Sequence, residues 1–333
     1  MTIYAKVPKV ELHIHLEGAI PFDALFELIN KYGGDPSIPD IDSLKKRFIY
    51  RDFSQFIEIW FWKNSFIREY EDFTFISELV ARDLYKQNIK YAEMFFSPST
   101  FAKNTSMNVQ EITSAVRKGF SKVSEISISL IADLVRDYGP GHEIKTLYQL
   151  NELKQYGIIG IGIGGSEHEY PAILFQDLFN KAHDFGFYTT AHAGEAAGAQ
   201  SIKDAVFKLH VDRIGHGTNA YDDPELMNYL AKKSLPVELC PLSNVSTGVI
   251  SGIKEHPIRK YYDNGLLISV NTDDPKMFGN TLEKEYNTLE NELNFTKQEI
   301  AKIILMGIKS SWLSSEEKKT MKDNFIKDTN WIK

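Results

Sequence analysis

The sequence predicts an α/β fold, a (β/α)8 barrel that residues 1–333 form as a single domain. Eight short apolar runs alternate with amphipathic stretches long enough for helices, and no low-complexity linker marks a domain boundary. Strands that alternate with helices form parallel sheets, and eight such units favour a closed barrel over an open sheet. Polar clusters follow the ends of several runs, where barrels of this kind carry their chemistry.

The expected strands are the apolar runs, listed by residue number: 10–15, 91–96, 126–133, 158–162, 188–192, 213–216, 236–239 and 267–271. Helices are expected where apolar residues recur at helical spacing between these runs: 107–123, 141–156, 171–185, 199–209, 224–233 and 256–264.

The segment 22–90 is too long for one crossover helix, so we expect several extra helices after the first strand. We interpret its aromatic stretch as a lid over the C-terminal face of the barrel. An alternative explains each aromatic residue equally well, namely core packing at helical spacing. The residues concerned are Phe53, Phe56, Trp60, Phe61, Trp62 and Phe66.

Composition narrows the functional classes. Apolar residues make up 43% and charged residues 25%, which is typical of a soluble globular protein. The net charge is −7 and no basic block is interleaved with aromatics, so we expect no nucleic-acid partner. Cys240 is the one cysteine, which excludes a disulfide framework and indicates a reducing compartment. Without an apolar run of membrane-spanning or signal-peptide length, we expect a cytoplasmic protein and no membrane partner. The oligomeric state is left open.

His13 and His15 stand two residues apart on an expected strand, so both imidazoles point to the same side. Backbone hydrogen bonds alone could satisfy such a pair. His192 offers a third imidazole, and Asp273 or Asp274 a carboxylate, which together make a plausible zinc shell. Because the strand 158–162 has no lysine that could bridge two metals, we expect one zinc ion per chain.

Three further groups are candidates for catalysis. Glu195 lies three residues after His192 and could donate a proton from an apolar pocket, although a solvated loop glutamate fits the pattern too. His216 lies between two glycines, so its ring could approach a bound water; a structural role is the alternative. Of Asp273 and Asp274, one could bind metal while the other accepts a proton, unless both belong to a turn or helix cap.

The glycine-rich segment 160–167 superficially resembles a nucleotide-binding loop, but it lacks the spacing of both common phosphate motifs. We interpret these glycines as residues that let backbone amides touch a flat ligand.

Five motifs together resemble the adenosine deaminase family of metal-dependent amidohydrolases, in order and over nearly the whole chain. They are Pro8-Lys9-Val10-Glu11-Leu12-His13-Ile14-His15-Leu16-Glu17-Gly18, His192-Ala193-Gly194-Glu195, Arg213-Ile214-Gly215-His216-Gly217-Thr218, Cys240-Pro241-Leu242-Ser243-Asn244 and Asn271-Thr272-Asp273-Asp274-Pro275. The resemblance implies one zinc ion held by His13, His15, His192 and Asp273.

The resemblance also implies the roles of the remaining residues. Glu195 would protonate purine N1, His216 would orient and deprotonate the attacking water, and Asp274 would hydrogen-bond the attacking hydroxide. The backbone amide of Gly165 would contact purine N3. The residues in contact with substrate would be His15, Glu17, Gly165 and Asp274.

The implied reaction is hydrolytic deamination of adenosine and 2′-deoxyadenosine, with a purine nucleoside as the small-molecule partner. Glu17 replaces an aspartate that in many family members contacts the ribose 5′ end, and relatives acting on free adenine also carry His-Leu-Glu-Gly. Gly215, however, stands where we associate the free-adenine branch with an aspartate. Adenine, 5′-methylthioadenosine and aminodeoxyfutalosine therefore stay open as substrates, as does a non-catalytic purine-binding protein. A two-metal esterase is disfavoured by the missing lysine.

Overall fold

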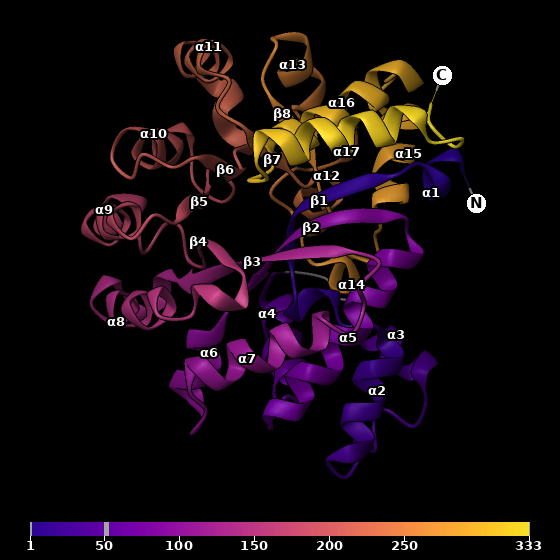
Figure 1. The fold of residues 1–333 in the computed structure, drawn as a ribbon, viewed down its shortest axis with the longest axis vertical. Helices are drawn as coiled ribbons and strands as arrows, with labels where there is room; N and C mark the ends of the chain where they lie inside the picture. The colour runs from indigo at the N-terminus through magenta and orange to yellow at the C-terminus, as the bar shows by residue number, and fades with distance from the viewer. Residues whose placement is uncertain (1, 50–52, 333) are drawn as a thin grey trace.

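The computed structural model describes residues 2–49 and 53–332, without the side chains of Phe53 and Ser54. Eight parallel strands follow one another around a barrel in the order β1 to β8, as the sequence predicted (Figure 1). The strands are β1 (Lys9–His15), β2 (Ile89–Phe96), β3 (Ser127–Val135), β4 (Ile158–Gly164), β5 (Tyr188–Ala193), β6 (Arg213–His216), β7 (Val237–Leu239) and β8 (Ile268–Val270).

The barrel closes between the end of β8 and the middle of β1. Asp273 forms an isolated parallel bridge with Ile14. Its backbone N–H donates to His13 O, and its carbonyl accepts from His15 N, both at 2.9 Å. Two residues before this bridge on each strand, Leu12 N donates to Asn271 Oδ1 at 3.0 Å. Closure thus depends on a few residues just beyond β8.

All eight strands lie where they were expected, but some ends differ. β3 continues to Val135 and β4 to Gly164, because Val135 pairs with Gly164 and extends the ladder. β8 is shorter than expected and stops at Val270. Asp273 adopts a left-handed backbone with φ of 63°, which turns the chain out of the sheet soon after β8.

Helices surround the barrel (Figure 1). The six predicted between strands are present with two corrections, whereas the helices Pro98–Asn104 and Pro241–Ser246 were not predicted. The expected helix 141–156 is α8 followed by a separate 3-10 turn (Lys154–Tyr156), and 171–185 begins with a 3-10 turn (Ala172–Phe175) before α9. The helices between strands are α6 (Pro98–Asn104), α7 (Val109–Phe120), α8 (Pro140–Asn151), α9 (Gln176–Asp184), α10 (Ala199–Phe207), α11 (Pro224–Lys233), α12 (Pro241–Ser246) and α13 (Ile258–Asp263).

Helices at the two ends of the chain were not predicted. They are α1 (Ile3–Lys6), α14 (Pro275–Phe278), α15 (Leu282–Glu292), α16 (Lys297–Ser310) and α17 (Ser315–Lys327). α16 packs on β8 and β1, and a Cβ on Gly307 would lie 2.9 Å from Val10 Cγ2. This helix therefore covers the place where the barrel closes.

The long segment after β1 forms several helices, as expected: α2 (Phe22–Lys31), α3 (Ile41–Arg47), α4 (Phe53–Asn64) and α5 (Tyr70–Lys86). The ring of Phe56 in α4 stacks on Phe278 of α14, with ring centroids 5.5 Å apart. Lys63 Nζ of α4 donates to Glu17 O at 2.6 Å. α4 therefore lies over the segments that follow β1 and β8, which is the position a lid requires.

The aromatic residues of this segment do not all have the same environment. Phe56 and Phe66 are buried, whereas the side chain of Phe61 is 59% exposed. The side chain of Phe53 lies outside the described residues. Core packing accounts for the buried rings, and movement of α4 as a lid stays a prediction.

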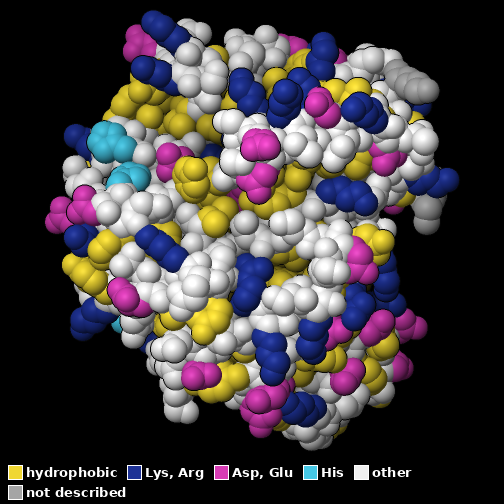
Figure 2. Space-filling view, in the orientation of Figure 1, with side chains coloured by type: hydrophobic (Ala, Val, Ile, Leu, Met, Phe, Trp, Pro, Cys, Tyr) yellow, Lys and Arg dark blue, Asp and Glu magenta, His cyan; other side chains and the backbone are white. Residues whose placement is uncertain are grey.

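The surface carries charges of both signs. On the face shown in Figure 2, Lys and Arg side chains alternate with Asp and Glu, and no broad basic field is visible. Within the described part of the chain, no helix combines the length and the apolar composition needed to cross a bilayer.

Glu143 of α8 provides a pH-dependent test of this fold. Its side chain is buried, and burial raises the pKa of Glu143 from 4.5 to about 7. The folded protein therefore binds an extra proton between pH 4.5 and 7, and the carboxyl group costs stability increasingly as pH rises through that window. At pH 8, we expect Glu143→Gln to raise the unfolding free energy by up to about 3 kcal/mol and therefore to raise Tm. Near pH 4, the substitution should have little effect on either quantity.

Thermal melts at both pH values measure this difference. Glu152→Gln, at an exposed position just after α8, is the matched control and should change neither melt. A gain from Glu143→Gln that is equal at pH 4 and pH 8 would contradict the assignment.

Candidate active site

Three imidazoles meet at the C-terminal end of the barrel. His13 and His15 come from β1 and His192 from β5, and alternation along β1 turns its two rings to the same side. One ring nitrogen from each histidine lies within 4.8 Å of the others. All three Nε2 atoms are buried and have no hydrogen-bond partner. Since buried polar atoms are nearly always satisfied, these nitrogens point to a ligand.

Asp273 completes this group. Its Oδ1 lies 3.4 Å from His15 Nε2 and 3.7 Å from His13 Nε2, while its Oδ2 accepts from Ser243 Oγ at 2.6 Å. The residue pattern alone left Asp273 and Asp274 open as the acidic partner, and the family resemblance implied Asp273. The structure places Asp273 against the imidazoles, and we call His13, His15, His192 and Asp273 the metal cluster.

The chemistry of the metal cluster fits a divalent ion. Three imidazole nitrogens and one carboxylate are a usual donor set for a single zinc ion. Burial lowers the pKa of His13, His15 and His192, and that of His15 to about 3, so the rings are neutral, the form that binds metal.

A buried ionic network sets the orientation of His13. Its Nδ1 lies 2.7 Å from Glu238 Oε2, so the proton sits on Nδ1 and the Nε2 lone pair faces the metal cluster. Glu238 pairs with Arg213, which in turn pairs with Glu93, and the guanidinium stacks on Trp312 at 3.6 Å. The sequence analysis quoted Arg213 only as part of a motif and missed Glu93, Glu238 and Trp312. The available signal was a charged residue inside each of three apolar strands.

Glu195 stands at the edge of the metal cluster. Its Oε2 lies 3.9 Å from His192 Nδ1 and 3.6 Å from His216 Nε2. Burial, and then the charge of Glu167, raise the pKa of Glu195 to about 8, so its carboxyl group carries a proton at neutral pH. Such a group can act as an acid.

The turn that carries Glu195 is held by Glu167. Its carboxylate accepts from the backbone N–H groups of Gly194, Ala196 and Ala197, at 2.5, 2.8 and 2.9 Å. Gly194 has φ of 68°, which favours glycine. Glu167 belongs to the glycine-rich segment noted in the sequence but was not singled out there.

His216 ends β6 in a left-handed conformation with φ of 58°, which is uncommon for a residue with a side chain. Its ring centroid lies 4.8 Å from that of His13 and 4.9 Å from that of His192. The unusual backbone therefore turns the imidazole toward the metal cluster.

Asp274 is buried, and its Oδ1 has no hydrogen-bond partner. Burial and the neighbouring Asp273 raise the pKa of this carboxyl group well above its usual value, while the positive charge of Lys63 opposes them. A Cβ on Gly18 would lie 1.8 Å from Asp274 Oδ1. The glycine of the first motif is thus required for the close approach of this carboxyl group.

A second pair of acids lies beside His15. Ser97 N donates to Glu17 Oε1 at 2.9 Å, and Ser97 Oγ lies 3.5 Å from Asp133 Oδ2. Each acid has a second buried oxygen without a partner, namely Glu17 Oε2 and Asp133 Oδ1. Asp133 Oδ2 lies 3.8 Å from His15 Nδ1. We call Glu17 and Asp133 the acidic end of the site; the sequence predicted only Glu17.

Lys63 is a buried cation next to the acidic end. It is 2% exposed, and besides Glu17 O its Nζ donates to Asn64 Oδ1 at 2.8 Å. No sequence pattern indicated Lys63, because α4 lies far from β1 along the chain and only tertiary packing brings them together.

The glycine-rich segment needs a correction. Gly160 and Gly162 belong to β4, where a Cβ would lie 2.5 Å from Trp312 and 2.8 Å from the ring of Phe95. Their role is to admit large neighbours, so the expected contact with a flat ligand is wrong for them. Gly165 follows β4 with φ of 105°, at the same rim as the metal cluster, where a Cβ would lie 2.2 Å from Asp137 Oδ2.

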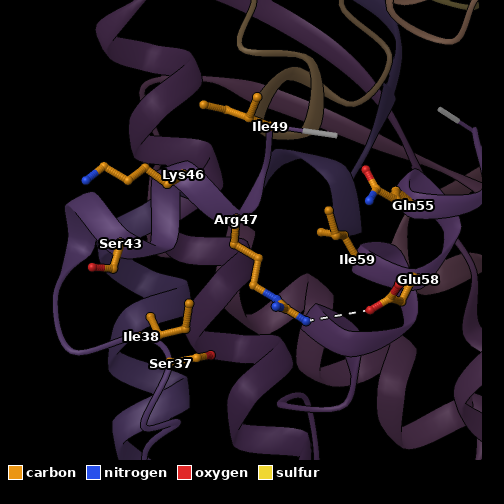
Figure 3. A pocket seen from close by; sticks show the side chains of 9 residues that line it. All are labelled: Ser37, Ile38, Ser43, Lys46, Arg47, Ile49, Gln55, Glu58 and Ile59. Carbon is orange, nitrogen blue, oxygen red and sulfur yellow. Dashed lines mark ion pairs between the residues drawn. The ribbon is translucent and has the colours of Figure 1, made fainter. Parts of the chain in front are cut away.

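A cavity of about 360 Å³ opens elsewhere, between α3 and α4 (Figure 3). Arg47 reaches across it to Glu58, with the charged atoms 3.8 Å apart. The cavity includes no residue of the metal cluster. Its lining consists of Ser37, Ile38, Ser43, Lys46, Arg47, Ile49, Gln55, Glu58 and Ile59.

Comparisons with known proteins cover almost the whole chain. The family model described as Adenosine deaminase matches residues 8–328. An adenine deaminase from Chlorobium phaeobacteroides is 32% identical over 323 residues, which are 96% of each chain. An adenosine deaminase from Shewanella loihica is 31% identical over 327 residues, 96% of this chain and 98% of the relative.

Solved structures share the fold. The adenine deaminase from Arthrobacter aurescens superimposes with a TM-score of 0.90 at 27% identity, over 96% of this chain and 98% of that one. An amidohydrolase from Burkholderia ambifaria, with bound Zn, has a TM-score of 0.88 at 25% identity, over 97% of this chain and 91% of that one.

The metal cluster predicts that zinc stabilises the folded chain. A ligand that binds only the folded state at a thousandfold excess over its Kd adds about 4 kcal/mol to the unfolding free energy. We therefore expect added Zn²⁺ to raise the Tm of metal-free protein by several degrees. His15→Ala should remove most of this rise.

Differential scanning calorimetry with and without Zn²⁺ measures the effect. His142→Ala is the matched control, because His142 lies in α8 outside the metal cluster. If Zn²⁺ raised the Tm of both variants equally, the ion would bind outside the metal cluster.

Proposed function

The chain belongs to the adenosine deaminase family, and we propose that it hydrolyses adenosine and 2′-deoxyadenosine at C6 to inosine or 2′-deoxyinosine plus ammonia. It is an enzyme that acts on purine amines. The observation that carries the proposal is a half-buried, protonated Glu195 whose Oε2 lies 3.6 Å from His216 Nε2, beside the metal cluster. The proposed acid, Glu195, thus lies next to the metal cluster, where the attacking water would bind.

His13, His15, His192 and Asp273 are the residues proposed to hold one zinc ion. Zinc at such a site lowers the pKa of water from 15.7 to roughly 7 and so makes hydroxide available at neutral pH. Glu238 supports the arrangement by fixing the proton of His13 on Nδ1. The zinc-containing Burkholderia amidohydrolase supports the choice of metal.

The residues around the metal cluster would handle the purine and the protons. Glu195 donates its proton to purine N1, which draws electrons from C6 and makes that carbon open to attack. The unpaired Asp274 Oδ1 orients the attacking water or the purine by accepting a hydrogen bond. Gly165 presents its backbone amide at the rim to purine N3. Removal of the amine leaves the proton on N1, as the product requires.

The acidic end favours a substrate with hydrogen-bond donors. Glu17 Oε2 and Asp133 Oδ1 are buried acceptors without partners, and ribose hydroxyl groups can satisfy both. A phosphate in their place would meet two carboxyl groups. These contacts support a nucleoside over a nucleotide.

Free adenine is the second candidate. The Chlorobium and Arthrobacter relatives are named adenine deaminases, and the N9–H of adenine is a donor that the acidic end could bind. One extra or missing group at a pocket edge is worth about 1–3 kcal/mol, so both purines need to be tested.

We also propose that residues 1–333 form one domain. A continuous apolar core that extends from Tyr4 to Ile332 supports this. The buried thiol of Cys240, which forms no disulfide, supports the cytoplasm as the place of action.

The substrate proposal is tested by the ultraviolet change on deamination. We expect the zinc-loaded protein to turn over adenosine faster than adenine, 5′-methylthioadenosine or aminodeoxyfutalosine, and AMP to be the poorest substrate because of the acidic end. Preference for adenine would keep the chemistry and replace the substrate. No turnover of any purine would leave a purine-binding protein.

The acid proposed here predicts a specific loss. Glu195→Gln removes the transferable proton but keeps the shape of the side chain, so kcat should fall by about 10²- to 10⁴-fold. Zinc content should not change, and Tm should not fall, because glutamine removes the cost of keeping this carboxyl group protonated. Glu169→Gln, at an exposed position near the same rim, is the control and should keep full activity. Activity of Glu195→Gln within tenfold of the wild type would exclude Glu195 as the acid.

A further inference from the structure

A chain of buried hydrogen bonds leads from α13 to His216. Ile258 N donates to His256 Nδ1 at 3.2 Å. His256 Nε2 lies 3.2 Å from Asn244 Oδ1, and Asn244 Nδ2 lies 3.1 Å from His216 Nδ1. All three side chains are at most 4% exposed, so water does not compete for these contacts.

The first bond in this chain has only one possible direction. A backbone N–H can only donate, and Ile258 is the first residue of α13, where the N–H has no acceptor within the helix. His256 Nδ1 must therefore be unprotonated. A neutral imidazole carries one proton, which then sits on His256 Nε2. Burial lowers the pKa of His256 to about 3, in agreement with a neutral ring.

The proton on His256 Nε2 then orients the amide of Asn244. If the amide were flipped, its NH2 group would face His256 Nε2, and two donors would meet. The orientation with Oδ1 toward His256 is the one that satisfies both groups. The hydroxyl group of Thr218 also donates to Asn244 Oδ1, at 3.2 Å.

Asn244 Nδ2 is thereby left to donate to His216 Nδ1. We infer that Asn244 and His256 are positioning residues that fix neutral His216 with its proton on Nε2, so that His216 offers the reacting water a donor and not a base. This inference rests on the proposed deamination only for the identity of the reaction. It departs from the role that the family resemblance implies for His216.

The proton balance of the reaction then runs through carboxyl groups. The attacking water forms the C6–O bond and gives one proton to Asp274, whose Oδ1 has no other partner. That proton replaces the one that Glu195 gives to N1. The second hydrogen of the water moves to the amine as the C6–N bond breaks, and ammonia leaves. His216 keeps its Nε2 proton throughout and holds the oxygen.

Asn244→Asp separates the two roles of His216. A carboxylate can only accept, so it would draw the His216 proton to Nδ1 and leave a lone pair on Nε2. If His216 serves as a donor, kcat should fall by about 10²-fold or more with little change in KM, since tautomer errors in hydrolases cost up to about 10⁴-fold. If His216 serves as a base, the variant should keep or gain activity, and the inference would be overturned.

Nuclear magnetic resonance identifies the tautomer of His216 independently of any activity measurement. Long-range ¹H–¹⁵N spectra of metal-free, ¹⁵N-histidine-labelled protein distinguish protonated from unprotonated ring nitrogens, and His216→Gln assigns the signals. We expect Nε2–H for His216 in the wild type, Nδ1–H in Asn244→Asp, and a mixture of both in His256→Ala. Asn264→Asp, at an exposed position just after α13, is the control and should match the wild type.

The outcomes separate this inference from the proposed function. An Nδ1–H signal from wild-type His216 in a protein that deaminates purines would overturn the positioning role alone. An Nε2–H signal in a protein that turns over no purine would overturn the function and leave the positioning role in place.

Discussion

Closure of the barrel at Asp273 is the constraint on which the site depends. The backbone of this residue bonds to both sides of Ile14, between the two histidines of β1. Its side chain meets the same two imidazoles. A left-handed backbone costs on the order of 1–3 kcal/mol in a residue other than glycine, and it persists here because the bonds of N–H and C=O hold it on both sides. The bonds that complete the barrel therefore also complete the metal cluster.

The hydrogen-bond partners of His13 and His216 place the proton of each imidazole on a different ring nitrogen. A carboxylate, Glu238, can only accept, so it keeps the proton of His13 on Nδ1 and frees Nε2 for a metal. An amide, Asn244, donates to His216 Nδ1 and leaves the proton on Nε2. The chemical difference between the two partners thus suits His13 to the proposed role of a metal ligand and His216 to the proposed role of a donor. The positions of the two histidines in the sequence do not indicate which ring nitrogen carries the proton.

The charges beneath the site explain how a barrel interior tolerates ions. Arg213 lies between Glu93 and Glu238, fully buried, so each charge has an opposite neighbour. Removing one partner of such a network leaves a buried charge unpaired and costs several kcal/mol. Above this network, at the C-terminal end of the barrel, Glu17 and Asp133 each have one buried oxygen without a hydrogen-bond partner. In the network below, each charge has an oppositely charged neighbour, whereas the acceptors above are left for a ligand.

The sequence alone determined the eight strands, the (β/α)8 order and the residues that gather at one rim. The physical reason is that alternation along a strand and the shared direction of parallel strands bring their C-terminal residues together, whatever the loops do. The strand pattern did not decide which neighbouring aspartate faces the imidazoles, because that depends on one backbone angle beyond β8; the family resemblance implied Asp273, and the tertiary structure has it there. It also decided the contacts of Lys63, Asp133, Asn244 and His256. These contacts join segments far apart in the chain, and the position of each side chain depends on packing that no local pattern records.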